Sequence, residues 1–361
     1  MHMADALLAP QVAGVMYAAS AGVAALSVIK LTKEQKQDLE SGLKKLPTMA
    51  VMAALVFAGQ MINYTIPGTG SSGHICGGML LTGLLGPWAG FLSMIAVLLV
   101  QCLFFADGGL MALGANVWNM AFYGCFVGYF LIYKPIMESK LMAGRGINAA
   151  NRTKIIISSI AGCILTLQLG AFSVVIETSL SGITDLTFGS FCLLMQPIHL
   201  AIGLVEGIVT AAVLVFVYET RPELVRNVRM EEGVKTRFSF KGIIIVLAVL
   251  AVVIGGGLSL LASSNPDGLE WSLFGNKEAG YSQNLGLDEE NYGNSSSISD
   301  SLAEIQEKTA FLPDYAFSGD SENAAGTSVS GIVGIAIVAV IAGGLCVIGV
   351  VRSRKKKDAA S

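Results

Sequence analysis

The chain has 361 residues, of which 53% are hydrophobic and only 14% are charged, and its mean hydropathy is +0.65. A soluble domain of this length needs a larger charged surface, so the composition argues against a soluble protein and for one that crosses a membrane several times. No basic patch with interleaved aromatic residues accompanies the net charge of −3, so we expect no nucleic-acid partner. The six cysteines are scattered without a Cys-x-x-Cys pair, which argues against a disulfide framework and against a zinc or iron–sulfur site.

Eight apolar runs follow one another along the chain, each long enough to cross a hydrocarbon core, which takes roughly twenty residues. No Lys or Arg precedes the first run, so the cationic start of a secretory signal is missing. We therefore expect the N-terminus to lie outside the cell and to be retained. The runs cover residues 7–29, 47–66, 76–105, 110–133, 155–177, 191–218, 241–263 and 329–351.

The topology follows from four cation-rich connections, which the positive-inside rule places in the cytoplasm. The rule holds throughout only if 76–105 crosses twice, as two short segments broken at Gly86-Pro87, because proline ends a helix near the preceding residue. We therefore predict nine segments, with the third one short, Asp107 outside and the C-terminus in the cytoplasm. The alternative is one long tilted helix over 76–105 that violates the rule. The connections are 30–45, 134–154, 221–241 and 352–357.

A hydrophilic stretch at 264–328 separates the last two spans, on the external side of the predicted topology. It holds twelve Asp and Glu but only two lysines, Lys277 and Lys308, among many Ser, Asn and Gly. Such a composition indicates a weakly ordered acidic loop. Its negative field would concentrate cations at an external opening, although a plain solvated loop is the alternative.

The three histidines, His2, His74 and His199, all belong to the external side of this topology. The Met1 amine, the His2 amide nitrogen and the His2 imidazole Nδ1 can close fused five- and six-membered chelate rings around one metal ion. One more imidazole would complete a square of nitrogens, the geometry associated with Ni(II) or Cu(II) and not with zinc. The alternative is that His2 is simply an exposed tail residue.

Polar residues within the spans gather toward their outer halves. Because buried polar side chains in a membrane must face one another or a cavity, they favour a shared outer cavity. Hydrogen bonding between helices without a functional role is the alternative. Glu206 lies deeper, as a candidate structural hydrogen-bond partner. The outer residues are Gln60, Asn63, Gln101, Asn116, Asn119, Glu177, Gln196 and His199.

Enzyme motifs are missing from the sequence. It has no G-x-x-x-x-G-K-[ST] phosphate-binding loop, no Ser/His/Asp constellation and no paired-carboxylate pattern. We therefore expect a transporter subunit without its own ATPase site, so ATP-driven transport would need another subunit. Ala50, Ala54 and Ala58 form a small-residue stripe, which allows close helix contact either with a partner or inside this chain.

Several segments resemble the substrate-binding component of nickel/cobalt energy-coupling-factor transporters, the CbiM/NikM family. The resemblance covers roughly residues 1–220, while Pro266-Asp267-Gly268-Leu269-Glu270 resembles a small accessory subunit with two helices and an external loop. The matching segments are Met1-His2, Ser72-Gly73-His74-Ile75-Cys76-Gly77-Gly78, Leu85-Gly86-Pro87-Trp88-Ala89-Gly90, Asp107-Gly108-Gly109-Leu110, Leu113-Gly114-Ala115-Asn116 through Asn119-Met120, and His199 through Gly203-Leu204-Val205-Glu206-Gly207.

The resemblance implies an all-α membrane protein with a seven-span core at 1–220, a cytoplasmic linker at 221–240 and an accessory region of two transmembrane helices at 241–361. It implies Ni²⁺ or Co²⁺ as the transported substrate, no organic cofactor, and the Met1 amine, the His2 nitrogens and the His74 imidazole as ligands. The residues expected to support these ligands are His199, Asn116, Asn119, Gln101 and Ser72.

The partners implied are a transmembrane coupling subunit, contacted by Ala50, Ala54 and Ala58, and ATP-binding subunits, all in a prokaryotic plasma membrane. An ion-coupled secondary transporter is one alternative, although it would more often carry ionisable residues at mid-membrane and repeated halves. A membrane sensor or assembly protein without a transport role is the other.

Overall fold

The computed structural model describes residues 2–37, 39–140, 142, 144–182, 187–230, 236, 238–280, 287, 292–293, 296–317 and 324–358, without the side chains of 37, 39–44 and 348–358. These residues form a helical bundle with one small β-hairpin, and six of the helices are long and apolar enough to cross a membrane. The predicted all-α multi-pass fold is confirmed, whereas the number of crossings stays a prediction. The six are Pro10–Lys36, Pro87–Phe105, Leu113–Glu138, Ile147–Ser181, Phe188–Thr220 and Ala324–Val347.

The elements follow the predicted apolar runs, and several extend beyond them into the connections. In chain order they are η1 (Asp5–Leu7), α1 (Pro10–Gln37), α2 (Leu39–Gln60), β1 (Tyr64–Ile66), β2 (Ser71–Gly73), α3 (Gly78–Leu85), α4 (Pro87–Phe105), α5 (Leu113–Asn116), the π-helical η2 (Val117–Tyr133), α6 (Lys134–Glu138), α7 (Ile147–Ser181), α8 (Phe188–Thr220), η3 (Pro222–Leu224), α9 (Phe240–Gly256), η4 (Leu258–Leu261), α10 (Gly268–Phe274), α11 (Ser297–Thr309), η5 (Pro313–Tyr315) and α12 (Ala324–Asp358).

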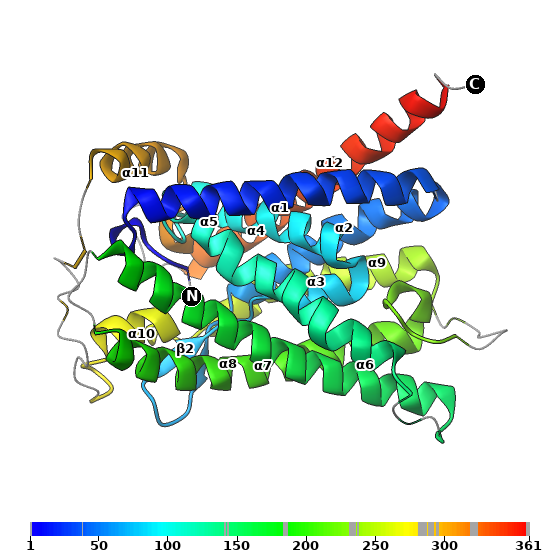
Figure 1. The fold of residues 1–361 in the computed structure, drawn as a ribbon, viewed down its shortest axis with the longest axis horizontal. Coiled ribbons are helices and arrows are strands. Elements are labelled where there is room, and N and C mark those ends of the chain that lie inside the picture. The colour runs from blue at the N-terminus through cyan, green and yellow to red at the C-terminus, as the bar shows by residue number, and fades with distance from the viewer. Residues whose placement is uncertain are drawn as a thin grey trace.

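The two ends of the bundle carry different elements. The hairpin strand β2, the short helices α10 and α11 and the N-terminal segment lie together at one end, and α6 and the junction of α1 with α2 lie at the other (Figure 1). The first end therefore carries both predicted ligand segments, and the second carries two of the cation-rich connections.

The chain runs out and back between residues 74 and 107. The helix breaks at Gly86, as predicted, where a φ of +83° suits only glycine. At the break, Arg226 of the cation-rich connection donates its Nη2 hydrogen to the Leu85 carbonyl at 2.8 Å. His74 and Asp107, which lie at the two ends of this stretch, both contact His2. The break is thus at the end opposite to the predicted metal ligands.

The first part of this stretch, residues 74–85, is only partly helical, and buried side chains form hydrogen bonds with its non-helical backbone. Helix α3 has only eight residues and reaches about 12 Å, so the non-helical residues before it cover the remaining distance. Glu206 accepts hydrogen bonds from the amides of Cys76 at 2.8 Å and Gly77 at 2.9 Å, and Gln60 Nε2 donates to the Cys76 carbonyl at 2.7 Å. Non-helical backbone at membrane depth requires such internal partners. The expectation that Glu206 is a structural hydrogen-bond partner is confirmed.

The expectation of a weakly ordered loop over 264–328 is wrong for its described residues, which contain α10, α11 and η5. Helix α10 begins with a capping box, in which Asp267 accepts from the amides of Leu269 and Glu270 while the Glu270 side chain accepts from the Asp267 amide. Ser296 caps α11 by accepting a hydrogen bond from the Ser299 amide. Local capping thus orders segments whose overall composition is polar. The domain boundaries at 220 and 240 stay predictions.

The alanine stripe lies on α2. Ala54 and Ala58 are buried, and glycines of the chain's own C-terminal helices approach the stripe, with Gly343 of α12 opposite Ala50 and Gly255 of α9 opposite Ala58. The stripe therefore packs inside the same chain, and its contact with a coupling subunit stays a prediction. Small residues allow this close approach of helices.

Candidate metal centre

The segment after the N-terminus is inserted between the helices and held by its backbone. Asn116 makes two hydrogen bonds with Met3: the Met3 amide donates to Asn116 Oδ1 at 2.7 Å, and Asn116 Nδ2 donates to the Met3 carbonyl at 3.2 Å. The Gly109 amide donates to the same carbonyl at 2.9 Å, and Asp5 accepts from the Ala112 amide at 2.9 Å. These bonds fix where residue 2 lies, so Asn116 supports the site through the backbone of the tail.

The His2 imidazole has a partner at each ring nitrogen. Nδ1 lies 3.0 Å from Asp107 Oδ1, and Nε2 lies 3.3 Å from Gln101 Oε1. The ring also stacks on His74, with centroids 5.4 Å apart and planes at 18°. The Asp107 carboxylate only accepts, so Nδ1 carries the hydrogen in this contact. For Nδ1 to bind a metal ion, the ring must turn away from Asp107 and the hydrogen must move to Nε2, where Gln101 Oε1 can accept it.

His74 follows the β1–β2 hairpin directly, in which Tyr64 pairs with Gly73. Its side chain is buried, and its Nδ1 lies 3.0 Å from the Ile75 carbonyl oxygen. A carbonyl only accepts, so Nδ1 carries the hydrogen and Nε2 has the lone pair. The hairpin and this bond together orient an imidazole that can bind a metal through Nε2.

Burial keeps both imidazoles neutral at pH 7. It lowers the pKa of His2 from its ordinary value and lowers that of His74 to about 4. Desolvation disfavours the charged form of a histidine, which lowers its pKa. A neutral imidazole is the form that binds a metal ion, so neither ring has to lose a proton first.

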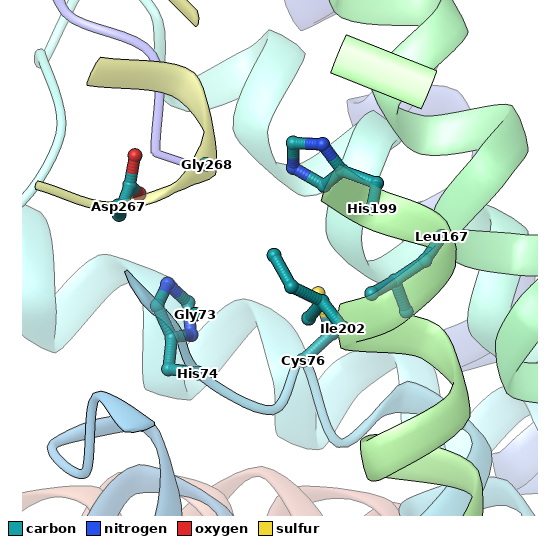
Figure 2. Close-up of a pocket in the computed structure, with 8 residues that line it drawn as sticks. All are labelled: Gly73, His74, Cys76, Leu167, His199, Ile202, Asp267 and Gly268. Carbon is teal, nitrogen blue, oxygen red and sulfur yellow. The ribbon is translucent and has the colours of Figure 1, made fainter. Parts of the chain in front are cut away.

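A small cavity lies beside His74. Its volume is about 10 Å³, close to the least that holds one water molecule. Figure 2 shows Asp267 and His74 on one side of it and His199 on the other. His199 donates from Nδ1 to the Met195 carbonyl at 2.8 Å, and its buried Nε2 has no hydrogen-bond partner among the residues that the structure describes. Other lining residues are Gly73, Cys76, Leu167, Ile202 and Gly268.

Asn119 and Ser72 are the remaining residues that were predicted to support the ligands. Asn119 Nδ2 donates to Glu177 at 2.8 Å and lies 3.6 Å from the Met3 sulfur, so it contacts the N-terminal segment. Ser72 belongs to β2 and donates from Oγ to the Asn265 carbonyl at 2.7 Å. The structure therefore brings His2, His74, Gln101 and Asn116 together, while His199 lines the adjacent cavity and Ser72 lies on β2 next to the lining residue Gly73.

Met1 lies outside the described residues. Among the residues that are described, no three or more His, Cys, Asp or Glu side chains are grouped as they would be to hold a metal ion. A site that uses two imidazoles together with main-chain nitrogens would not require such a group. The described part brings the two imidazoles together, and the ligand set as a whole stays a prediction.

Two carboxylates near the histidines were not predicted as site residues. Asp107 contacts His2, and Asp267 borders the cavity beside His74. Both lie within segments on which the family resemblance rests, Asp107-Gly108-Gly109-Leu110 and Pro266-Asp267-Gly268-Leu269-Glu270. The sequence signal was therefore present, but only the fold places both acidic residues near the imidazoles.

Comparison with known proteins covers both parts of the chain. Residues 2–224 match the family model CbiM, described as the cobalt uptake substrate-specific transmembrane region, and residues 241–350 match the PDGLE domain. The putative fused nickel transport protein NikMN of Archaeoglobus fulgidus is 38% identical over 229 residues, which are 63% of this chain and 68% of that protein. The probable fused nickel transport protein LarMN of Lactiplantibacillus plantarum is 42% identical over 129 residues, 36% of this chain and 38% of that protein.

A crystal structure of a truncated transition metal transporter is 31% identical and covers 61% of this chain and 99% of its own, with a TM-score of 0.49. The CbiM match alone covers more than half of the chain. The chain therefore belongs to the CbiM family of nickel and cobalt transport proteins, with a PDGLE domain joined on its C-terminal side.

Proposed function

We propose that this chain captures Ni²⁺ or Co²⁺ outside the cell as the substrate-binding subunit of an energy-coupling-factor transporter. The observation that carries the proposal is the contact between His2 and His74, whose ring centroids lie 5.4 Å apart although the two residues are 72 positions apart in the sequence. Both side chains are buried and neutral. The N-terminal segment and β2, which directly precedes His74, lie at the same end of the bundle (Figure 1).

The ligands in this proposal are the Met1 amine, the amide and Nδ1 nitrogens of His2, and Nε2 of His74. The bonds from Asn116 to Met3 support it, because they fix the backbone directly after the chelating residues. Gln101 supports it because its Oε1 can accept the Nε2 hydrogen of His2 once Nδ1 has left Asp107 and has a lone pair for the metal. Four nitrogens in a square suit a divalent ion such as Ni²⁺.

Transport would be driven by other subunits, a transmembrane coupling subunit and ATP-binding subunits. The sequence contains no phosphate-binding loop of its own. We place the N-terminus outside and the C-terminus in the cytoplasm of a prokaryotic plasma membrane. Ion-coupled secondary transport is less well supported, because Glu206, its candidate mid-membrane carrier, is engaged by the amides of Cys76 and Gly77.

The test is uptake of radioactive nickel and cobalt by cells that produce this chain with its partner subunits. Uptake should require an ATPase with an intact phosphate-binding lysine and should be lost in His74→Ala. Equal uptake with an inactive ATPase would favour a secondary transporter, and no uptake of either ion under any condition would favour a sensor or assembly protein.

A further inference from the structure

The C-terminal region, residues 241–361, contacts the loop that leads to His74 and the loop whose Asp107 contacts His2. On the His74 side, the Ser72 amide donates to the Pro266 carbonyl at 2.8 Å, and Ser72 Oγ donates to the Asn265 carbonyl at 2.7 Å. Ser72 also pairs with Asp267 as neighbouring parallel strands do. Residues 265–267 therefore lie alongside β2, the strand that directly precedes His74.

On the His2 side, two side chains of the C-terminal region hold the loop between α4 and α5. The Tyr315 hydroxyl donates to Asp107 Oδ2 at 2.6 Å, and Gln306 Nε2 donates to the Gly108 carbonyl at 2.7 Å. The other oxygen of Asp107 is the one that lies 3.0 Å from His2. The C-terminal region thus reaches the surroundings of each histidine by a separate route.

Asp267 is the charged residue that this region places in the cavity with His74 and His199 (Figure 2). Its Oδ1 accepts from the amides of Leu269 at 2.8 Å and Glu270 at 3.0 Å, so the cap of α10 fixes the carboxylate in position. Both of these cap bonds are made by Oδ1, and a carboxylate has a second oxygen, through which it can contact a cation while Oδ1 caps the helix.

The close approach of this segment to His199 depends on Gly268. A Cβ at that position would lie 3.0 Å from His199 Cε1 and 2.8 Å from Ile198 Cγ2, so only glycine fits without displacement. Nε2 of His199 faces the same cavity, where it has no partner among the described residues and has the lone pair, because Nδ1 carries the hydrogen. A water molecule in the cavity could donate to it.

We propose that Asp267 is a further residue of the metal site, whose carboxylate holds the divalent ion beside His74, directly or through one water molecule that also donates to His199. The inference rests on the proposed metal capture by His2 and His74. A dication that leaves water for a site of neutral imidazoles needs negative charge close by. The CbiM part of the chain would then supply the nitrogens, and the C-terminal region would supply a carboxylate.

The test separates the charge of Asp267 from its capping of α10. Asp267→Asn keeps a good helix cap but removes the charge, whereas Asp267→Glu keeps the charge on a poorer capping residue. Ni²⁺ alone, and then Co²⁺ alone, are titrated into the purified full chain, and the nickel d–d spectrum is recorded. Glu307→Gln, which removes an exposed carboxylate of the same region, is the matched control.

We expect Asp267→Asn to weaken Ni²⁺ binding by ten- to a hundredfold, as loss of a supporting residue at a metal site does, and to shift the d–d band. Asp267→Glu should bind more tightly than Asp267→Asn, and Glu307→Gln should match the wild type. The inference is overturned if Asp267→Asn binds as the wild type does, or more tightly than Asp267→Glu, which would reveal a capping role alone. If the wild-type chain binds neither ion, the proposed function itself fails.

Discussion

His2 and His74 stack their imidazole rings at an interplanar angle of 18°, so the faces of the rings, and not their lone pairs, are directed at each other. A common ion must therefore lie beside the stack, at the edges of the rings. His2 can present Nδ1 there only by leaving Asp107, whereas His74 already has its lone pair on Nε2. His74 is thus already oriented by its hydrogen bond to the Ile75 carbonyl, whereas the His2 ring has to rotate before its Nδ1 can bind a metal ion.

The chelate model predicts that one additional residue before Met1, or a blocked amine, abolishes tight nickel binding. Asn116 fixes the backbone of Met3, so an extended chain could not slide to restore a free amine next to His2. Equilibrium titration of the purified protein measures the effect, and one residue added after Ser361 provides the control. Undiminished affinity for both nickel and cobalt in the extended protein would rule out the amine as a ligand.

The hydrogen bonds of Glu206 predict a structural defect in Glu206→Gln. A glutamine offers one acceptor oxygen and places an NH₂ group against a backbone donor, so the amide of Cys76 or Gly77 loses its partner. One buried unsatisfied amide costs about 1–3 kcal/mol. We expect a lower melting temperature without metal, and weaker metal binding because His74 lies two residues before Cys76.

Glu219→Gln is the matched control for that variant. Glu219 lies on the same helix, but it is exposed, and its ion pair with Arg152 at 3.2 Å contributes little to stability. Melting curves of the two variants should therefore differ clearly. If Glu206→Gln has the same melting temperature as the wild type, the non-helical backbone directly before α3 does not depend on this carboxylate.

The distribution of apolar and charged residues along the sequence was enough to predict much of the fold. The apolar runs predicted the helices, and the conflict with the positive-inside rule located the break at Gly86 correctly. The same argument predicted that His2, His74 and His199 lie on one side, and the structure brings them to the same end of the bundle, whereas the side of the membrane that this end faces stays a prediction.

Side-chain pairing and local order could not be predicted in this way. The composition of 264–328 favours disorder, but the capping box of Asp267 and Glu270 and the packing of 265–267 along β2 order part of it. Which helices face the alanine stripe depends on the arrangement of the bundle, so Gly255 and Gly343 were not predicted as its neighbours. Asp107 and Asp267 join the site only through contacts between segments far apart in the sequence.

The predicted orientation can be measured with single cysteines. Lys277 and Arg145 are exposed, and they belong to the predicted outer and cytoplasmic sides, respectively. In a background without the six native cysteines, Lys277→Cys should react with a membrane-impermeant thiol reagent added to intact cells, whereas Arg145→Cys should react only after the cells are opened. Labelling of position 145 from outside would invert the topology.

The last prediction compares His74→Ala with His199→Ala. His74 stacks on His2 and carries its lone pair on Nε2, because Nδ1 donates to the Ile75 carbonyl, so we expect its loss to remove tight nickel binding and the d–d band of a planar nickel site. His199 lies across the small cavity and accepts at most a hydrogen bond from a water molecule near the ion. We therefore expect His199→Ala to weaken binding by ten- to a hundredfold and to keep a measurable band.

The two variants control for each other, because each removes one buried imidazole at the same end of the bundle, and melting curves without metal show whether either has lost its fold. Titration with nickel, followed by the spectrum of each complex, decides between them. If His199→Ala eliminates the band and His74→Ala retains it, the fourth ligand is His199. In that case the ion lies in the cavity between His199 and Asp267, and the stacked ring of His74 only orients His2.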